Sequence, residues 1–491
     1  MKYPLAGIFA AVALAQASPL AAQSEDLNDL GQAVLAAQND TPLQVSAGNS
    51  LQNTCADLAS ERPNGIPMND NPEDNLALRC TQMVVTAVGL NDPGGSRGGF
   101  DLGLNNEQLA EAMQQLSGEE QVSKGRLATE SSNGQFGNIG MRLDAIRAGA
   151  RATAGGLSVA MNGMPVSGGN AGDEDSGWGW FLNGAVGTGD RDATAGEDEY
   201  EYDSFGATLG FDYMYDSGFV AGIALGYSDY EVDFETTQSF VAGTDLTSTQ
   251  SGGGFEVDGY SISLYGIGDV GPISVDGLVS YGQSEYDTER IIDYRSAPGA
   301  NTAIIVNRSM TGSTDSESLT IGLNASKVLD LGGVDLALSG GFSYLDLTVD
   351  GYTEKDRAIG MDTAAASGLA LRYEDQDVES LQSAVGAQVS KVFWTGTGVI
   401  LPFAKGEWRL EFENDSDAIK TRYAAYDNEV RADGSDLIVN SDDPDEDYFE
   451  VGIGVSAVFA QNIQAFIDYT TTVDLDDVSA DLITIGIRGS F

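Results

Sequence analysis

The chain has 491 residues, enough for two or three ordinary domains or for a large barrel with a smaller domain. It carries 24 Lys and Arg against 75 Asp and Glu, so its formal net charge is −51. A surface of this sign repels nucleic acid and argues against binding it. The sequence has no His, which removes the commonest zinc ligand and the usual base of a Ser-His-Asp triad. We therefore predict no catalytic residue, no cofactor and no metal site.

Residues 1–22 form a predicted export signal. Lys2 gives it a positive start, and residues 5–14 form an apolar core that is too short to span a bilayer. Cleavage is expected after Ala22 or after Ala17. No later stretch reaches the roughly 20 apolar residues of a membrane helix. An exported chain without such a helix, but with many amphipathic strands, indicates a bacterial-type outer membrane.

Residues 23–130 are predicted to form a small helical domain. Hydrophobic residues recur there at helical spacing in four stretches: 27–34, 51–58, 76–84 and 109–116. The only two cysteines, Cys55 and Cys80, lie 25 positions apart on two of these apolar faces. In an oxidising compartment we expect them to form a disulfide that contributes about 3 kcal/mol. The alternative is a segment that is partly disordered before it meets a partner.

Residues 131–177 are a predicted linker that contains a helix and then a flexible tether rich in Gly and Ser over 152–177. The helix carries a basic run in a chain with few bases: Arg142, Arg147 and Arg151. In one interpretation it lies inside an acid-rich lumen, where arginine forks onto carboxylates. The candidate partners are acids on the polar phase of later strands: Asp212, Asp276, Glu407, Glu450 and Asp468. In the other interpretation it is a solvated basic helix outside the barrel.

Residues 178–491 alternate between apolar and polar positions in twelve predicted strands. The last strand places its apolar residues on one face: Ile483, Ile485, Ile487 and Phe491. Such a strand fits a wall between lipid and a watery lumen, and no open sheet edge is tolerated in hydrocarbon. The predicted fold is therefore an all-β transmembrane barrel of about 12 antiparallel strands, with a lumenal linker helix and a preceding small α-helical domain. A soluble β-sandwich is the alternative.

The connections between these strands are asymmetric. Short ones would face the periplasm: 216–217, 269–272, 330–333, 394–398 and 460–461. Long acidic ones would be extracellular loops: 189–202, 231–256, 287–313, 349–377 and 414–446. Their acidity suits solvated loops, and bridging by divalent cations is the alternative.

Several segments resemble the barrel domain of monomeric autotransporters, the type V secretion class. The run 138–149 resembles the linker helix of that family, and further likeness lies at 178–180, 206–213, 222–227, 408–413 and Phe491. The resemblance covers residues 135–491. It implies a twelve-stranded barrel around a helix and insertion into outer-membrane lipid by the barrel-assembly machinery, which reads the last strand, with help from periplasmic chaperones. It also implies export of a preceding passenger to the cell surface.

Two departures from that family matter. The passenger is short and helical, without β-helix repeats or a Gly-Asp-Ser nucleophile block, and the linker has no adjacent Asn pair for self-cleavage. The leading hypothesis is a barrel that exports and anchors a helical domain, which binds an unknown surface ligand. The alternatives are a stand-alone porin or adhesin-like barrel with a periplasmic helical domain, and an enzyme. The exported part before the linker has only Lys124 to assist a Ser nucleophile.

Overall fold

The structure is a computed structural model of the whole chain. It describes residues 41–61, 70–91, 100–118, 123–124, 137–143, 146, 151–153, 156–161, 164–167, 177–194, 197–235, 237–248, 252–296, 304–395, 398–413, 418–426, 435–439, 447–459, 463–475 and 477–490. The predicted export signal, the helix predicted near residue 30 and Phe491 lie outside these ranges.

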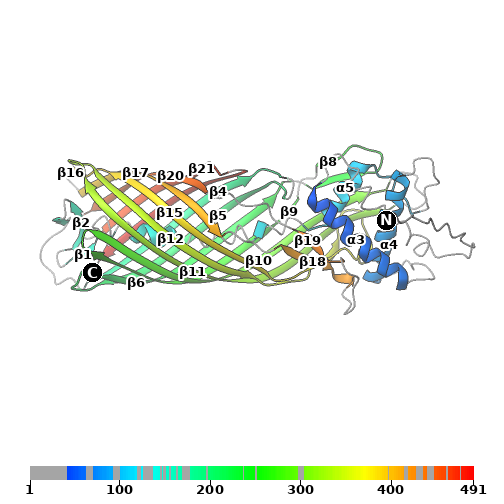
Figure 1. Cartoon of the computed structure of the whole chain (residues 1–491), viewed down its shortest axis with the longest axis horizontal. Helices are drawn as coiled ribbons and strands as arrows, with labels where there is room; N and C mark the ends of the chain where they lie inside the picture. Colours follow the sequence, from blue (N-terminus) through cyan, green and yellow to red (C-terminus); the bar gives the residue numbers. More distant parts are fainter. Residues whose placement is uncertain are drawn as a thin grey trace, which may run out of the picture.

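A closed antiparallel β-barrel dominates the molecule (Figure 1). In the part of the chain that the structure describes, its wall has twelve strands, each paired with the next in sequence: β4 (Trp178–Arg191), β5 (Tyr200–Met214), β6 (Val220–Phe234), β9 (Gly253–Val270), β10 (Ile273–Arg295), β11 (Ile305–Asp330), β12 (Asp335–Val349), β15 (Gln376–Ser390), β17 (Gly398–Glu413), β20 (Asp447–Phe459), β21 (Ile463–Val473) and β22 (Val478–Ser490). The last strand closes the ring on the first, with Ile485 opposite Gly184. The predicted fold class is confirmed.

The three isoleucines of the last strand lie on the outer face of the barrel. Ile483, Ile485 and Ile487 are exposed, whereas Thr484 and Gly486 between them, and Arg488 after them, are buried. Apolar side chains outside and polar ones inside are the pattern of a wall that faces lipid and encloses a polar lumen.

The barrel is taller than the sequence predicts. The segment 287–313, predicted as a loop, instead continues β10 to Arg295 and begins β11 at Ile305. Asp287 is exposed while its neighbours Tyr286 and Thr288 are buried, so this segment alternates as a strand although its composition is typical of a loop. Short elements lie within three of the other predicted long loops, 231–256, 349–377 and 414–446: β7 (Gln238–Val241), β8 (Thr247–Ser248), β13 (Lys355–Ala358), β14 (Leu371–Tyr373), β18 (Ile419–Tyr423), η2 (Ala424–Tyr426) and β19 (Leu437–Val439).

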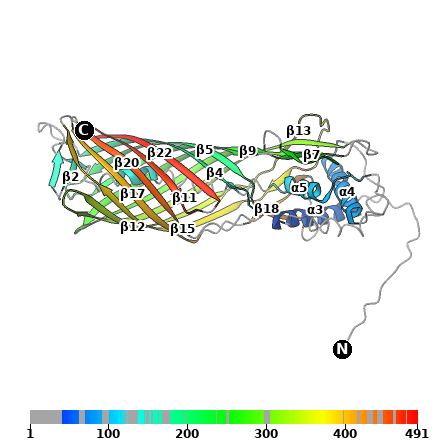
Figure 2. The same cartoon turned by 90° about the horizontal axis from the view of Figure 1, so that it is seen from above.

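Among the described residues, three helices lie at the end of the barrel that is far from the C-terminus (Figures 1 and 2). They are α3 (Pro42–Glu61), α4 (Pro72–Asn91) and α5 (Asn106–Gln115). α5 begins with a capping box, in which the Asn105 side chain accepts from Gln108 and the Gln108 side chain accepts from Asn105. None of the described helices has the length and apolarity to cross a membrane.

A small sheet lies at the opposite end, beside the C-terminus (Figure 1). Its strands are β1 (Arg151–Thr153), β2 (Gly156–Met161) and β3 (Met164–Ser167). The prediction of a plain flexible tether over 152–177 is therefore wrong for the residues of these strands. Their Gly-rich composition is typical of a tether, but their backbones pair as a sheet. At the same end, the longer predicted turn forms β16 (Phe393–Thr395), which pairs with β17.

Candidate functional site: the lumen and the mouth of the barrel

The lumen holds the predicted linker helix. Residues 137–143 are helical. The guanidinium of Arg142 donates from Nε and Nη2 to the two carboxylate oxygens of Asp212 on β5, both at 2.7 Å. Both side chains are buried, and the hydroxyl of Tyr265 on β9 donates to the same carboxylate at 3.0 Å. A Cβ at residue 179 would lie only 2.5 Å from an Asp212 oxygen, so Gly179 leaves room for this forked ion pair.

The apolar stripe of the same helix packs on the wall. We call this cluster the lumen core: Ile139, Leu143, Ile146, Phe181, Val220, Ala224, Tyr265, Ile267 and Leu278. In addition, the side-chain amide of Asn183 on β4 donates to the carbonyl of Asn138 at 2.8 Å. The described part of the helix is thus held inside the barrel, which excludes the solvated interpretation for these residues.

Of the three predicted arginines, the structure describes only Arg142 within the lumenal helix. Arg147 lies outside the described residues, and Arg151 begins β1 instead of continuing the helix. Three of the predicted acidic partners pair with cations of the wall. Arg409 on β17 contacts Glu407 at 2.9 Å and Glu450 at 3.0 Å, and Lys405 contacts Asp468 at 2.7 Å.

The sequence did contain a signal for these wall pairs. Lys405, Glu407 and Arg409 recur at every second position, as residues on one face of a strand do. Asp276 is buried on β10, and Asp212 is a candidate acid that pairs with Arg142.

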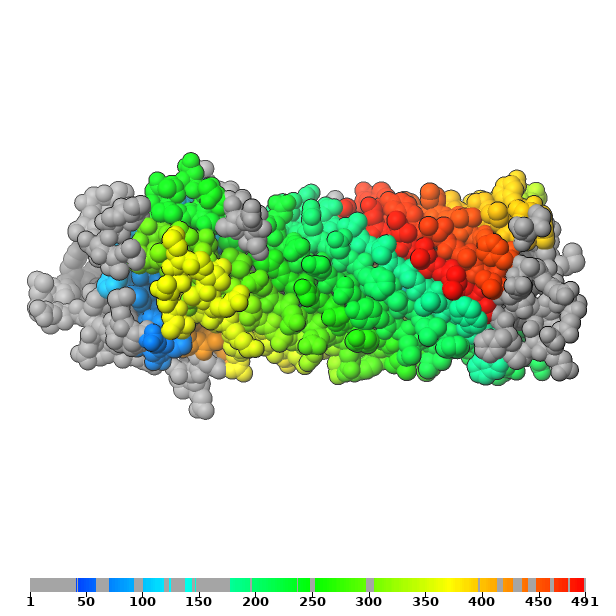
Figure 3. All heavy atoms as spheres, turned by 180° about the vertical axis from the view of Figure 1, so that it is seen from behind, coloured from blue at the N-terminus to red at the C-terminus, as the bar shows by residue number. Residues whose placement is uncertain are grey.

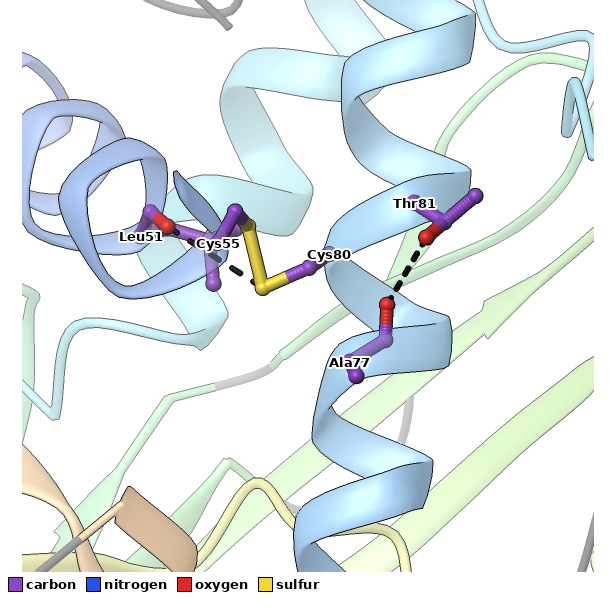
Figure 4. The surroundings of a disulfide bond; sticks show 5 residues. All are labelled: Leu51, Cys55, Ala77, Cys80 and Thr81. Carbon is purple, nitrogen blue, oxygen red and sulfur yellow. Dashed lines mark hydrogen bonds between the residues drawn. A yellow bond between two sulfur atoms is a disulfide. The ribbon is translucent and has the colours of Figure 1, made fainter. Parts of the chain in front are cut away.

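The helices at the mouth are joined by the predicted disulfide (Figure 4). Cys55 on α3 and Cys80 on α4 are bonded, with their Cα atoms 5.4 Å apart, and both side chains are fully buried. The bond closes a loop of 25 residues and ties together two helices that are short for an independent core.

The helices share one hydrophobic core with the barrel. We call this cluster the mouth core. Its helical members include Leu51, Leu58, Leu76, Met83, Leu109 and Met113, and its barrel and loop members include Ile292, Tyr294, Val306, Met310, Leu371, Tyr423 and Val439. The segment near residues 350–375 (yellow) lies directly against the blue helices in Figure 3. The helical region therefore does not bury a core of its own.

A buried ion pair lies at the base of the mouth core. Arg290 on β10 contacts Glu354 at 2.6 Å, and neither side chain is more than 1% exposed. Arg290 also donates to the carbonyl of Gln115, the last residue of α5, at 2.6 Å. The backbone N–H of Leu371 donates to Glu354 at 2.8 Å. One charge pair thus joins a barrel strand, a helix end and a loop.

Lys124 lies beside this ion pair on a pair of tyrosines. Its Nζ donates to the Tyr352 hydroxyl at 2.8 Å and lies 4.1 Å from the centre of that ring, which stacks on Tyr373. Burial lowers the pKa of Lys124 well below its usual value, although the charge of Glu354 opposes the shift. In the described residues its hydrogen bond goes to a tyrosine and not to a serine nucleophile.

Polar contacts also fix the helices to the loops. On α3, the hydroxyls of Ser46 and Ser50 donate to the carbonyls of Ile438 and Ser435, both at 2.7 Å. Near the start of α4, a Cβ at Gly368 would lie 2.3 Å from the carbonyl oxygen of Pro72. Gly368 also has φ of +80°, so a glycine is needed there on two counts.

A sequence profile described as autotransporter beta-domain matches residues 180–470, more than half of the chain. The chain belongs to the autotransporter β-domain family. It is thus an outer-membrane β-barrel with the translocator fold. A search of curated protein sequences gives no match.

Solved structures with a similar arrangement include other autotransporters. The translocator domain of NalP from Neisseria meningitidis aligns with a TM-score of 0.49 at 14% identity, over 75% of this chain and 100% of that one. The β-domain of BrkA from Bordetella aligns with 0.40 at 14% identity, over 64% and 100%. The transport unit of AIDA-I from Escherichia coli aligns with 0.37 at 14% identity, over 64% and 90%.

Proposed function

We propose that this autotransporter exports its own N-terminal helices to the cell surface and keeps them there as a cap on its barrel. The helices lie at the end with the long connections, which is the extracellular end of bacterial barrels. The chain then runs from α5 at the mouth, through residues 137–143 in the lumen, to β1–β3 at the opposite end. This path is the one expected for a chain that has passed outward through its own pore.

The observation that carries the proposal is the shared mouth core. The helices and the long connections pack their apolar residues into one cluster around the Arg290–Glu354 pair. The exported helices therefore end docked on the mouth of the barrel. Removing the helices from the barrel would expose this apolar surface to water and break the hydrogen bond from Arg290 to the carbonyl of Gln115, and both losses oppose release. The helices are accordingly an anchored passenger, and their outer face is the part available to a surface ligand.

The proposal gives the barrel no bond-making chemistry: its work is insertion, sealing and tethering. A stand-alone porin with a periplasmic helical domain would place the helices at the short-turn end, where the structure has β1–β3 instead. We assign recognition by the barrel-assembly machinery to the last strand through the lipid-facing Ile483, Ile485 and Ile487, together with Phe491.

Single-cysteine labelling of intact cells tests the proposal. Both native cysteines are in the disulfide, so an added cysteine is the only free thiol. Asn49 is exposed on α3, and Leu331 is exposed in the short turn between β11 and β12. A membrane-impermeant maleimide should label Asn49→Cys on intact cells, and Leu331→Cys only after the outer membrane is opened. An Asn49→Cys chain that reacts only after opening would place the helices in the periplasm and contradict export.

A further inference from the structure

On several strands of the barrel, the face that carries apolar side chains changes from the outside to the inside part-way along the strand. On β5 the exposed outer residues are apolar near the C-terminal end of the barrel and acidic nearer the mouth: Phe211, Leu209 and Phe205 give way to Asp203 and Glu201. The buried inner residues change in the opposite sense, from Asp212 and Thr208 to Tyr202 and Tyr200.

Neighbouring strands reverse at the same level. On β6 the outer face passes from Leu225 to Asp229, Glu231 and Asp233, while the inner face passes from Ser228 to Tyr230, Val232 and Phe234. On β9 the outer face passes from Leu264 and Ile262 to Asp258 and Glu256, while the inner face passes from Tyr265 and Ile267 against the lumenal helix, through Ser263, to Val257 and Phe255. A lipid-facing wall has to be apolar outside. The reversal therefore marks where the barrel leaves the bilayer and becomes a stalk in water.

Twelve of the described side chains inside this stalk form one apolar cluster, beside buried hydroxyl groups such as those of Ser316 and Ser380. We call the cluster the stalk core: Tyr200, Tyr202, Tyr230, Val232, Phe234, Phe255, Val257, Tyr286, Leu345, Leu347, Val349 and Val378. These residues come from β5, β6, β9, β10, β12 and β15. Ring centroids lie 6.0 Å apart for Tyr200 and Phe234 and 6.5 Å apart for Phe255 and Tyr286, and Tyr286 is fully buried. The interior of a water-filled pore is polar instead.

The stalk core lies between the two other clusters. Along β10, Leu278 belongs to the lumen core, Tyr286 to the stalk core and Ile292 to the mouth core. We propose that the stalk core, which lines the barrel wall, acts as an ion seal at a level separate from the lumen core that holds the helix. An apolar constriction excludes ions because water leaves it and the ions cannot keep their hydration shells. The barrel then stays closed when the helix below loosens.

Conductance of the purified full chain in planar bilayers tests the seal. Loosening the helix with Arg142→Gln and Asp212→Asn together should leave the conductance at the wild-type level. Adding Tyr286→Ser, Val232→Ser and Leu347→Ser should raise it by about tenfold or more, since the constriction becomes polar. The matched control places serine on the outer face next to each of these, at Asp287, Glu231 and Asp346, and should change nothing. Open channels in the helix variant alone would overturn the seal, as would a stalk variant that is folded by heat-modifiability yet remains closed.

A second measurement leaves the stalk intact and so does not depend on how the serine variants fold. In the loosened-helix background, Ser284→Cys lies on the inner face of β10 just beyond Tyr286, and Glu285→Cys lies on its outer face. A charged thiol reagent applied outside intact cells should modify Glu285→Cys at least about tenfold faster than Ser284→Cys, because the seal excludes ions. Equal rates at the two positions would overturn the inference.

Discussion

The two levels of the barrel follow the same alternation with opposite signs. On β6, Leu225 faces lipid with Ser228 inside, whereas a few residues later Glu231 faces water with Val232 inside. Both levels obey one rule, which is that the apolar face turns away from water. The difference teaches that alternation identifies a strand, but only the surrounding solvent decides which face of that strand is the core.

The first prediction concerns the buried Arg290–Glu354 ion pair, which lies where the stalk meets the helices. If the interior there resembles the core of a soluble protein, then removing one charge of the pair should be costly. Arg290→Gln leaves Glu354 buried without its cation, which should destabilise helix docking by about 4 kcal/mol. The measurement is the temperature at which the helices become protease-sensitive while the barrel stays folded. The matched control is Arg357→Gln, whose guanidinium is 71% exposed and 4.0 Å from Glu289. It should change docking by less than about 0.5 kcal/mol, and equal effects of the two variants would contradict a shared core.

A lysine placed on the outer face of β6, once in the lipid-facing part and once in the stalk, compares the surroundings of the two levels directly. Leu225→Lys puts a cation on the lipid-facing wall and should cost about 3 kcal/mol. Glu231→Lys lies six positions later on the same outer face, in water, and should change stability by less than about 0.5 kcal/mol. Unfolding of the purified barrel in urea compares the two variants. Similar costs would mean that both levels lie in the bilayer and that the reversal does not mark its edge.

The smallest expected effect concerns Glu111 on α5 and depends on pH. Burial raises the pKa of Glu111 from 4.5 to about 7; nearby Asp198 and Glu107 act in the same direction, against hydrogen bonds from Gln115 and the backbone of Gln238. Between pH 4.5 and 7 the undocked helix loses its proton first, so docking weakens as the pH rises through this window. Above pH 7, Glu111→Gln should stabilise docking by about 1 kcal/mol, with no gain below pH 4.5. A gain that is the same at both pH values would contradict the shift.

The sequence was most informative where one local pattern fixes one structure. Ile483, Ile485 and Ile487 predict a lipid-facing strand because period two and apolarity agree, and Cys55 and Cys80 have no other cysteine as a partner. It failed where two patterns conflict. Asp287 and Glu289 have the composition of a loop, but Thr288 between them and Arg290 after them are buried, and only the neighbouring strands reveal that.

The contact between the helices and the loops had no local signal at all. Ser50 and Ser435, which hydrogen-bond across the mouth, are 385 positions apart, and the helical period of α3 says nothing of what covers it. Sequence reasoning treated residues 23–130 as a domain in their own right. The shared mouth core shows that the described helices instead complete their interior with barrel strands.

The most direct test of the account is a cross-link between the helices and the loops in living cells. With Ser50→Cys and Ser435→Cys, the two positions joined by the 2.7 Å hydrogen bond should become a disulfide in most molecules. The linked chain should still react with antibody to the helices on intact cells. Ser50→Cys with Ser217→Cys, which lies in the short turn between β5 and β6, should give no such link. A link to Ser217→Cys, or a Ser50–Ser435 pair that stays reduced while the helices are displayed, would contradict a cap fixed on its own barrel.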